Sequence, residues 1–350
     1  MRSWKDHKFF RWGGRALLLC VFLLVLLLTA CTADDPAPAT LPPPEVAVTP
    51  ADAQTRSQVE PTATTADPTA ASTVTPTQPA TEASPLPPTA TPRPPSPTPN
   101  YTPTPDTRPD PRTWRTWPVI PTVSARAVEI YQQGLASGSD PSTFSIIGDC
   151  QSEPPVFFGI YATDRYILPE SEQYLQETIA HFQGNFDRQH TTVKNGLSVA
   201  SVFSPLWAPK DVCQAGETPL ECEFRLYQPS IVFINLGTNW KDGDGFSHAV
   251  RLREVIDFVI AHGALPILST KGDNQEGDDS INLTTAELAY EYDIPLWNYW
   301  ASIQYLPNHG LDKDRTDSNY LSVAAWDERS YTGLRVLDRV WRTVNDMEIP

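Results

Sequence analysis

Apolar residues follow two different periods along residues 122–350. Spacings of three and four residues predict amphipathic helices, and short continuous apolar runs predict buried strands. The helices are expected over 125–135, 170–186, 250–262, 282–292 and 333–344. The strands are expected over 144–147, 230–236, 264–269 and 295–299. Such alternation predicts an α/β fold, a three-layer α/β/α sandwich around a parallel sheet.

The preceding stretch, residues 31–121, lacks either period. It is rich in Pro, Thr and Ala, and residues 32–121 hold 24 of the 36 prolines. Large apolar side chains are too few to offset the entropy lost on ordering. We therefore expect a disordered, semi-rigid linker over 31–121 and one folded domain over 122–350.

The N-terminus has the layout of an export signal. Basic residues precede an apolar run over 16–28, which is too short for a comfortable membrane span. The segment ends in Ala30-Cys31, which resembles the lipobox of bacterial lipoproteins. This resemblance implies a signal peptide over 1–30, lipidation of Cys31 and anchoring to the outer face of a bacterial membrane. The alternative is an ordinary signal peptide with an incidental cysteine.

Charge is distributed unevenly. Residues 1–116 carry 10 basic and 10 acidic side chains, so the net charge of −16 lies on the remainder. A nucleic-acid partner needs a basic surface and is therefore not expected. Solubility is the simplest explanation for the acidic domain.

The chain has five cysteines. Cys20 lies in the signal segment and Cys31 is the expected lipidation site. Cys213 and Cys222 flank a short loop sequence and are predicted to form a disulfide, because exported proteins commonly oxidise such pairs. A metal-binding pair is the alternative, but two further ligands are lacking nearby. We expect no metal and no cofactor, and Cys150 is left as a free thiol.

Cys150 follows the first predicted strand, within Gly148-Asp149-Cys150. Ligands of parallel sheets bind at the carboxyl ends of the strands. A following helix start lowers the pKa of a thiol. The sequence therefore predicts a reactive Cys150, and a half-buried cysteine in a turn is the alternative.

Two further glycine turns offer hydrogen-bond donors. Gly237 and Asn239 follow the 230–236 strand, and a positioned amide suits an oxyanion. A turn-forming asparagine is the alternative. Gly196 offers a backbone N–H, and a polar loop over 312–322 precedes the last helix.

Together and in this order, these segments resemble the sequence blocks of the SGNH/GDSL hydrolase family. Gly148-Asp149-Cys150 matches its Gly-Asp-Ser, Gly196 its glycine block, and Gly237-Thr238-Asn239-Trp240 its Gly-x-Asn-Asp. Asp317-Ser318-Asn319-Tyr320 stands where the family has Asp-x-x-His. The resemblance implies a flavodoxin-like fold, ester hydrolysis, and an oxyanion hole formed by Cys150, Gly196 and Asn239.

The departures concern the catalytic residues. Cys150 replaces the serine, Tyr320 the histidine and Trp240 the aspartate. Tyrosine is a poor base at neutral pH, because its pKa is about 10. His309 or His248 would have to supply the missing imidazole, although a loop histidine is more often a solvated surface residue.

Three hypotheses follow. The retained oxyanion residues favour a site that binds a small-molecule or glycan ester, and the missing histidine favours little or no turnover. The alternative is an active ester hydrolase with Cys150 as nucleophile and another base such as His309. A purely structural surface protein is the third.

Overall fold

The computed structural model describes residues 106–240, 244–315 and 319–350. The predicted signal segment, Cys31 and most of the predicted linker lie outside these residues. The centre of the domain is a four-stranded parallel sheet in the order β1-β2-β3-β4. The strands are β1 (Asp140–Gly148), β2 (Pro229–Asn235), β3 (Leu265–Ser269) and β4 (Leu296–Trp297). Because the strands are parallel, their carboxyl ends meet at one edge, and Cys150 follows β1 there.

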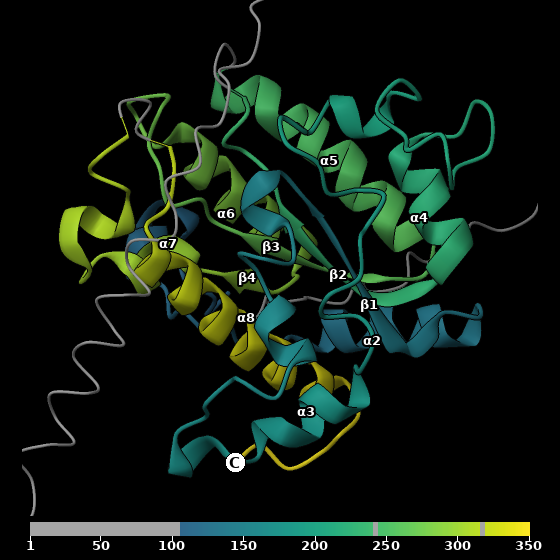
Figure 1. Ribbon diagram of the computed structural model, residues 1–350, viewed down its shortest axis with the longest axis horizontal. Coiled ribbons are helices and arrows are strands. Elements are labelled where there is room, and N and C mark those ends of the chain that lie inside the picture. Colours follow the sequence, from purple (N-terminus) through teal and green to yellow (C-terminus); the bar gives the residue numbers. More distant parts are fainter. Residues whose placement is uncertain (1–105, 241–243, 316–318) are drawn as a thin grey trace, which may run out of the picture. The chain divides into compact units, whose positions relative to one another are not determined.

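Helices cover both faces of the sheet (Figure 1). One layer contains α2 (Ala125–Ala136), α3 (Leu175–His181) and α8 (Val323–Val344). The other contains α4 (Pro219–Tyr227), α5 (Gly245–Ala261) and α6 (Ser280–Tyr292). A short helix, α7 (Tyr299–Ile303), follows β4. The predicted α/β/α arrangement with a parallel sheet is confirmed.

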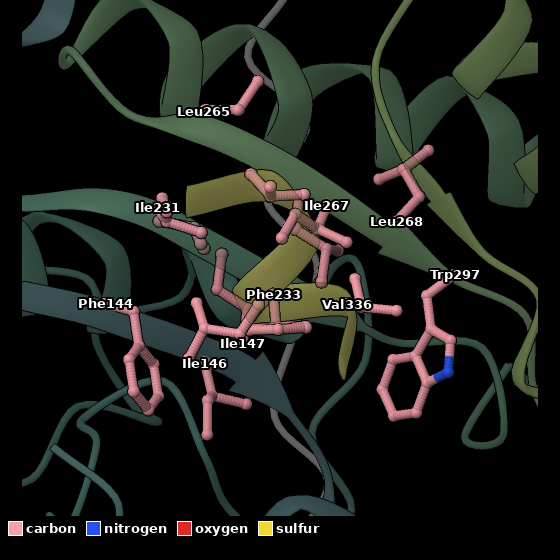
Figure 2. Close-up of a cluster of buried hydrophobic side chains, with 14 of the residues drawn as sticks. Phe144, Ile146, Ile147, Ile231, Phe233, Leu265, Ile267, Leu268, Trp297 and Val336 are labelled. Atoms are coloured by element: carbon pink, nitrogen blue, oxygen red, sulfur yellow. The ribbon is translucent and has the colours of Figure 1, made fainter. Parts of the chain in front are cut away.

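The hydrophobic core lies between these layers. Figure 2 shows side chains from all four strands, together with Val336 of α8. The ring of Phe144 packs against those of Phe158, Phe182 and Phe233, with centroids 5.5–6.2 Å apart. Because both faces of the sheet are covered, β2 is buried along its whole length, which explains its continuous apolar sequence.

Several helices differ in length from the sequence prediction. The helix expected over 170–186 is reduced to a 3-10 turn, η4 (Glu170–Glu172), followed by α3. In contrast, α5 and α8 begin before their predicted starts. Asp244 and Ser322 accept backbone N–H groups as N-caps and so fix the earlier starts.

The predicted last strand is also shorter than expected. Only Leu296 and Trp297 pair with β3, and Asn298 then caps α7. The side-chain oxygen of Asn298 accepts from the N–H of Ala301, which turns the chain from strand to helix.

Residues 106–121, which we call the strap, fold onto the domain although their composition placed them in the linker. The strap contains the 3-10 helix η1 (Pro111–Thr116) and buries Trp114 to 1% exposure. The side-chain amide of Asn298 donates to the carbonyl oxygens of Trp114 (2.8 Å) and Trp117 (3.0 Å). Folded structure among the described residues therefore starts before residue 122.

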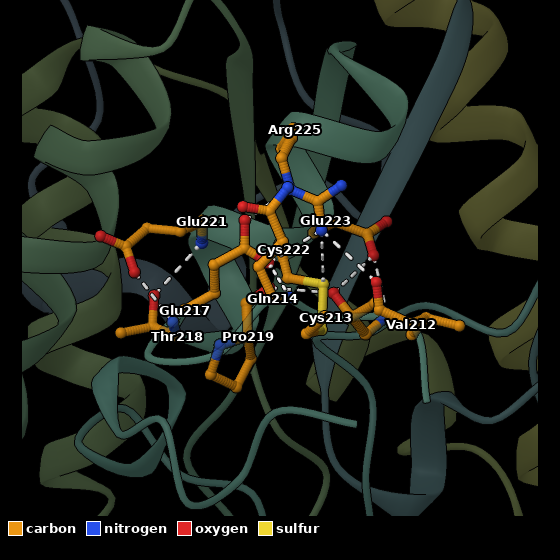
Figure 3. Close-up of a disulfide and its surroundings, with 11 residues drawn as sticks. Val212, Cys213, Gln214, Glu217, Thr218, Pro219, Glu221, Cys222, Glu223 and Arg225 are labelled. Atoms are coloured by element: carbon orange, nitrogen blue, oxygen red, sulfur yellow. Dashed lines mark hydrogen bonds and ion pairs between the residues drawn. A yellow bond between two sulfur atoms is a disulfide. The ribbon is translucent and has the colours of Figure 1, made fainter. Parts of the chain in front are cut away.

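The predicted disulfide between Cys213 and Cys222 is present (Figure 3). It joins the loop before α4 to that helix. Thr218 and Glu221 form a capping box at the helix start, in which each side chain accepts the other residue's backbone N–H. Among the described residues, no helix is both long and apolar enough to cross a membrane.

Candidate functional site

The turn after β1, which we call the Cys150 turn, contains the 3-10 helix η2 (Cys150–Ser152). Asp149 caps this helix, and its Oδ1 accepts from the N–H of Gln151 at 2.9 Å. A Cβ at Gly148 would lie 2.2 Å from Oγ of Ser152, so only glycine fits there. The tight turn presents Cys150 half-buried at the sheet edge, as a free thiol.

The turn that bears Gly196 lies beside the Cys150 turn. The N–H of Gly148 donates to the carbonyl oxygen of Thr192 (3.0 Å). The N–H of Lys194 donates to the carbonyl oxygen of Gly148 (3.2 Å). The chain then reverses through a turn closed by the N–H of Leu197 on the carbonyl of Lys194, at 3.0 Å. Gly196 has φ +82°, a conformation that favours glycine.

A buried carboxylate fixes the segment that leads into the Gly196 turn. Glu223 of α4 accepts hydrogen bonds from Ser145, Arg188, His190 and the N–H of Thr191, at 2.7–2.9 Å. Burial alone would raise its pKa, but His190, Arg188 and the hydrogen bonds outweigh it and hold the pKa at about 2. Glu223 is therefore ionised and joins α4, β1 and this segment.

Asn239 connects the two turns. Its Nδ2 donates to Oδ2 of Asp149 (3.3 Å) and to the carbonyl oxygen of Leu197 (3.2 Å). Gly237 allows this approach with φ +140°, and a Cβ there would lie 3.0 Å from the side chain of Ile281. The structure thus brings together the three segments that were predicted to form the oxyanion hole.

The last loop reaches the same edge. Leu311 and Leu321 form an antiparallel bridge, and Asn319 and Leu321 line a polar cavity with Asp149. Tyr320 is half-buried, and the guanidinium of Arg315 lies 3.3 Å from its ring centroid. Asp317, the other predicted residue of this block, lies outside the described residues.

The two candidate histidines differ in environment. His309 is exposed, and its Nδ1 lies 3.3 Å from the carbonyl oxygen of Gln304. His248 is fully buried, with both ring nitrogens unpartnered, and its ring packs edge-on against that of Trp240. Burial, and then Lys271, lower the pKa of His248 to about 4, so it is neutral at pH 7. Among the described residues, no hydrogen bond links either ring to Cys150.

The electrostatics of Cys150 differ from the prediction. Burial raises the pKa of its thiol, and the charges of Asp149 and Glu153 raise it further. Its own N–H and Arg329 oppose this shift in pKa without reversing it. The expected lowering of the thiol pKa by a helix start is therefore outweighed by burial and by the acidic residues Asp149 and Glu153.

Two residues of α8 that hold the Cys150 turn were not foreseen from the sequence. Arg329 donates to the backbone carbonyl oxygen of Gln151 (2.6 Å). The indole N–H of Trp326 donates to the side-chain oxygen of Gln151 (2.7 Å). Arg329 lies 178 residues after Gln151, in a part of α8 that precedes the predicted helix. Arg329 stands out because its charged side chain is buried. That burial is visible in the structure and not in the sequence.

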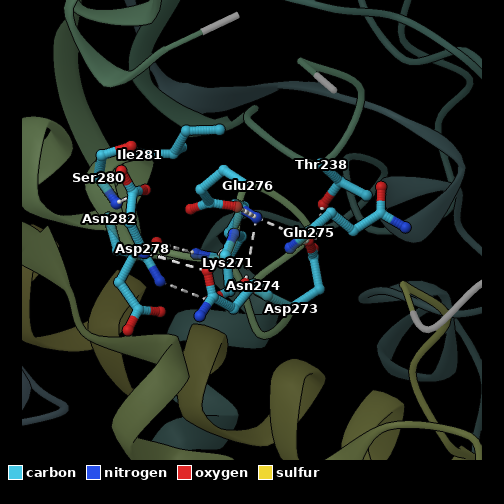
Figure 4. Close-up of polar contacts among 12 residues, drawn as sticks. Thr238, Lys271, Asp273, Asn274, Gln275, Glu276, Asp278, Ser280, Ile281 and Asn282 are labelled. Carbon is cyan, nitrogen blue, oxygen red and sulfur yellow. Dashed lines mark hydrogen bonds and ion pairs between the residues drawn. The ribbon is translucent and has the colours of Figure 1, made fainter. Parts of the chain in front are cut away.

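A second unforeseen cluster follows β3 (Figure 4). The ammonium group of Lys271 contacts Asp273 and Glu276, each at 2.6 Å, and all three side chains are buried. Oδ2 of Asp273 also accepts from the hydroxyl of Thr238, at 2.8 Å. The cluster thereby ties the segment after β3 to the turn that bears Asn239.

The described residues contain one group with the ligand types and spacing for a metal. It consists of Cys213, Glu217 and Cys222, and its two sulfurs are bonded to each other. Glu217 is paired with Arg225. The arrangement is that of a disulfide with a neighbouring ion pair.

No family model and no curated protein match this chain. Among solved structures, it is similar to a psychrotrophic esterase from Pseudoalteromonas sp., with 14% identity, a TM-score of 0.39, and coverage of 57% of this chain and 97% of the esterase. It is similar to a lipolytic protein of the G-D-S-L family from Veillonella parvula, with 16% identity, a TM-score of 0.33, and coverage of 56% and 100%. It is also similar to a lipase/acylhydrolase from Enterococcus faecalis, with 14% identity, a TM-score of 0.36, and coverage of 56% and 95%.

The parallel sheet with helices on both faces is the arrangement that the SGNH/GDSL resemblance implies. The chemistry of the site has to be argued from the residues of this chain.

Proposed function

We propose that this domain binds an ester at the edge that carries Cys150 and turns it over slowly or not at all. One observation carries the proposal. Among the described residues, the thiol of Cys150 has no hydrogen bond to an imidazole or a carboxylate, although the segments that bear Gly196 and Asn239 are assembled beside it. A nucleophile without an adjacent base is weak at its ordinary pKa.

Two steps would need that base. Attack of Cys150 on the ester carbonyl forms a thioester and releases the alcohol, which takes up a proton. Hydrolysis of the thioester then requires a water molecule to lose a proton as it attacks the carbonyl carbon. Tyr320 stacks with Arg315, and His309 contacts a backbone carbonyl at the surface, so neither is arranged as a base for Cys150.

The ligand class follows from the same site. The segments of Cys150, Gly196 and Asn239 suit the carbonyl of an ester, and the SGNH/GDSL resemblance favours an acylated glycan or another small ester. We further propose that Cys31 carries a lipid and that the domain lies outside the bacterial membrane, on the linker that precedes it.

The activity proposal is tested with p-nitrophenyl acetate in a stopped-flow instrument, with the full chain. We expect at most a single-turnover burst, absent in Cys150→Ala, and a very low steady-state rate. Tyr320→His should raise the steady-state rate, because it restores an imidazole to the family position. Rapid steady-state hydrolysis by the unmodified chain, abolished in Cys150→Ala and reduced in His309→Ala, would overturn the proposal in favour of an active enzyme.

The anchoring proposal is tested by detergent phase separation of the protein made in a bacterial host. The unmodified chain should partition into the detergent phase, and Cys31→Ser should partition into the aqueous phase. Equal partition of the two proteins would contradict lipidation at Cys31.

A further inference from the structure

Three residues that line the cavity beside Asp149 each carry a polar atom with no hydrogen-bond partner in the part of the chain that the structure describes. These atoms are Oδ1 of Asn235, Oδ1 of Asn319 and Nε of Arg329. Asn235 ends β2 and is 7% exposed, Asn319 lies in the last loop, and Arg329 lies in α8 and is 5% exposed. Leaving a buried polar atom unpaired costs about 1–3 kcal/mol, so three such atoms in one cavity need an explanation.

The three residues line one small cavity. Nδ2 of Asn235 and Nη2 of Arg329 both donate to the hydroxyl oxygen of Ser152, at 3.4 and 3.3 Å. The two side chains therefore converge on one atom, and both residues line the same cavity as Asn319. The centre of a water molecule has about 20 Å³ of room in this cavity.

The charged groups around the cavity are already paired. Asp149 accepts from the N–H of Gln151 and from Asn239, and Lys271 is paired with Asp273 and Glu276. The hydrogen bonds that a ligand in the cavity can make are therefore determined by the three unpaired atoms. Two of these atoms are acceptors and one is a donor.

This set of partners defines the ligand. The two amide oxygens require a group that donates two hydrogen bonds, and the N–H of Arg329 requires the same group to accept one. A metal or ammonium cation accepts nothing, and a simple anion donates nothing. One water molecule meets all three demands, and about 10–15 Å³ of such space is enough to hold it.

We infer that this cavity binds one internal water molecule, held by Asn235, Asn319 and Arg329. The water joins the end of β2, the loop that bears Tyr320, and the helix that holds the Cys150 turn. It thereby fixes the last loop relative to Cys150, through hydrogen bonds that the side chains alone do not make.

The first experiment is a crystal structure of the full chain at a resolution that shows ordered water. We expect a single peak within hydrogen-bond distance of all three atoms. An empty cavity, or side chains rotated so that the three atoms pair with protein groups, would overturn the inference. A peak with the coordination number and distances of a metal ion would overturn it as well.

The second experiment counts long-lived internal waters in solution by magnetic relaxation dispersion of the water nuclei. Asn319→Leu removes one acceptor at a partly exposed site, and it should lower the count by one relative to the unmodified chain. Asn345→Leu, a matched change at the exposed end of α8, should leave the count unchanged. An equal count in all three proteins would contradict the inference. If Asn319→Leu fails to fold, Asn319→Ala replaces it in the same comparison.

Discussion

Asn239 donates a hydrogen bond to Asp149 across 3.3 Å, at the place where an ester oxygen would be expected to seek the same amide. The second hydrogen of that amide goes to the carbonyl oxygen of Leu197. Both amide hydrogens thus have protein acceptors. An ester that enters this site has to compete with a carboxylate for its donor, which supports our proposal of slow turnover.

Asp149 should make the stability of the domain depend on pH. Burial raises its pKa to about 6, against an ordinary value of 3.8. Because the folded-state pKa is the higher one, the ionised form is disfavoured in the fold, and stability is lost as pH rises from about 4 to above 6. Asp149→Asn should remove this loss, which amounts to roughly 3 kcal/mol.

The measurement is urea denaturation of both proteins at pH 4, 6 and 8. The difference in unfolding free energy should shift in favour of the variant between pH 4 and pH 8. Asp327→Asn, at an exposed site on α8, is the control and should show no such trend. A difference that stays constant with pH would contradict the raised pKa of Asp149.

Cys150 should be alkylated slowly at neutral pH. Its thiol pKa is raised by burial and by Asp149 and Glu153, so the thiolate fraction is smaller than that of a free cysteine. The rate of labelling by iodoacetamide, followed by mass spectrometry, should keep rising at pH values where a model thiol has levelled off. Glu153→Gln should increase the rate near neutral pH. Labelling faster than that of a free cysteine at pH 7 would show that the thiol is activated.

Asn298 should hold the strap against the rest of the domain. Its amide is fully buried and donates to the carbonyl oxygens of Trp114 and Trp117. Asn298→Ala leaves both without these donors and should lower the unfolding free energy by about 1–3 kcal/mol. It should also increase cleavage by trypsin after Arg112 and Arg115, the two strap arginines that are not followed by proline. Asn345→Ala serves as the control, and unchanged cleavage in Asn298→Ala would mean that other contacts hold the strap.

The Cys213–Cys222 disulfide should stabilise the domain modestly. Its sequence separation is nine residues, and the chain-entropy relation gives about 2–3 kcal/mol for so short a loop. Denaturation of the unmodified chain should therefore become easier when a reducing agent is added. The Cys213→Ala/Cys222→Ala double variant should be less stable and insensitive to the reductant. Equal stability of oxidised and reduced protein would show that strain cancels the entropic gain.

The sheet could be predicted from the sequence, because β2 and β3 are apolar over their length and each is bounded by turn residues. Gly196 was indicated by the family resemblance, whereas the turns that bear Cys150 and Asn239 could be predicted because each follows a strand end. Local patterns sufficed in these places, since the structural cause lies within a few residues of the motif.

The parts that were missed depend on distant partners. Trp114 lies in a proline-rich stretch, and its burial is decided by Asn298 and Trp300, which are far along the chain. The first turns of α8 carry charged residues that resemble a loop, yet Arg329 is buried against the Cys150 turn. The raised pKa of Cys150 depends on how deeply that turn is buried, which no local pattern encodes.

The strap also determines how the domain would respond to mechanical load. Any pull transmitted along the chain from its N-terminal side reaches the domain first at residues 106–121. The load then falls first on the contacts of Asp106 and Arg108 with Tyr290 and Asp293. It falls next on the packing of Trp114 and the two hydrogen bonds of Asn298, before it reaches the sheet. Under tension, the strap is therefore expected to detach before the sheet, while the edge that carries Cys150 stays folded.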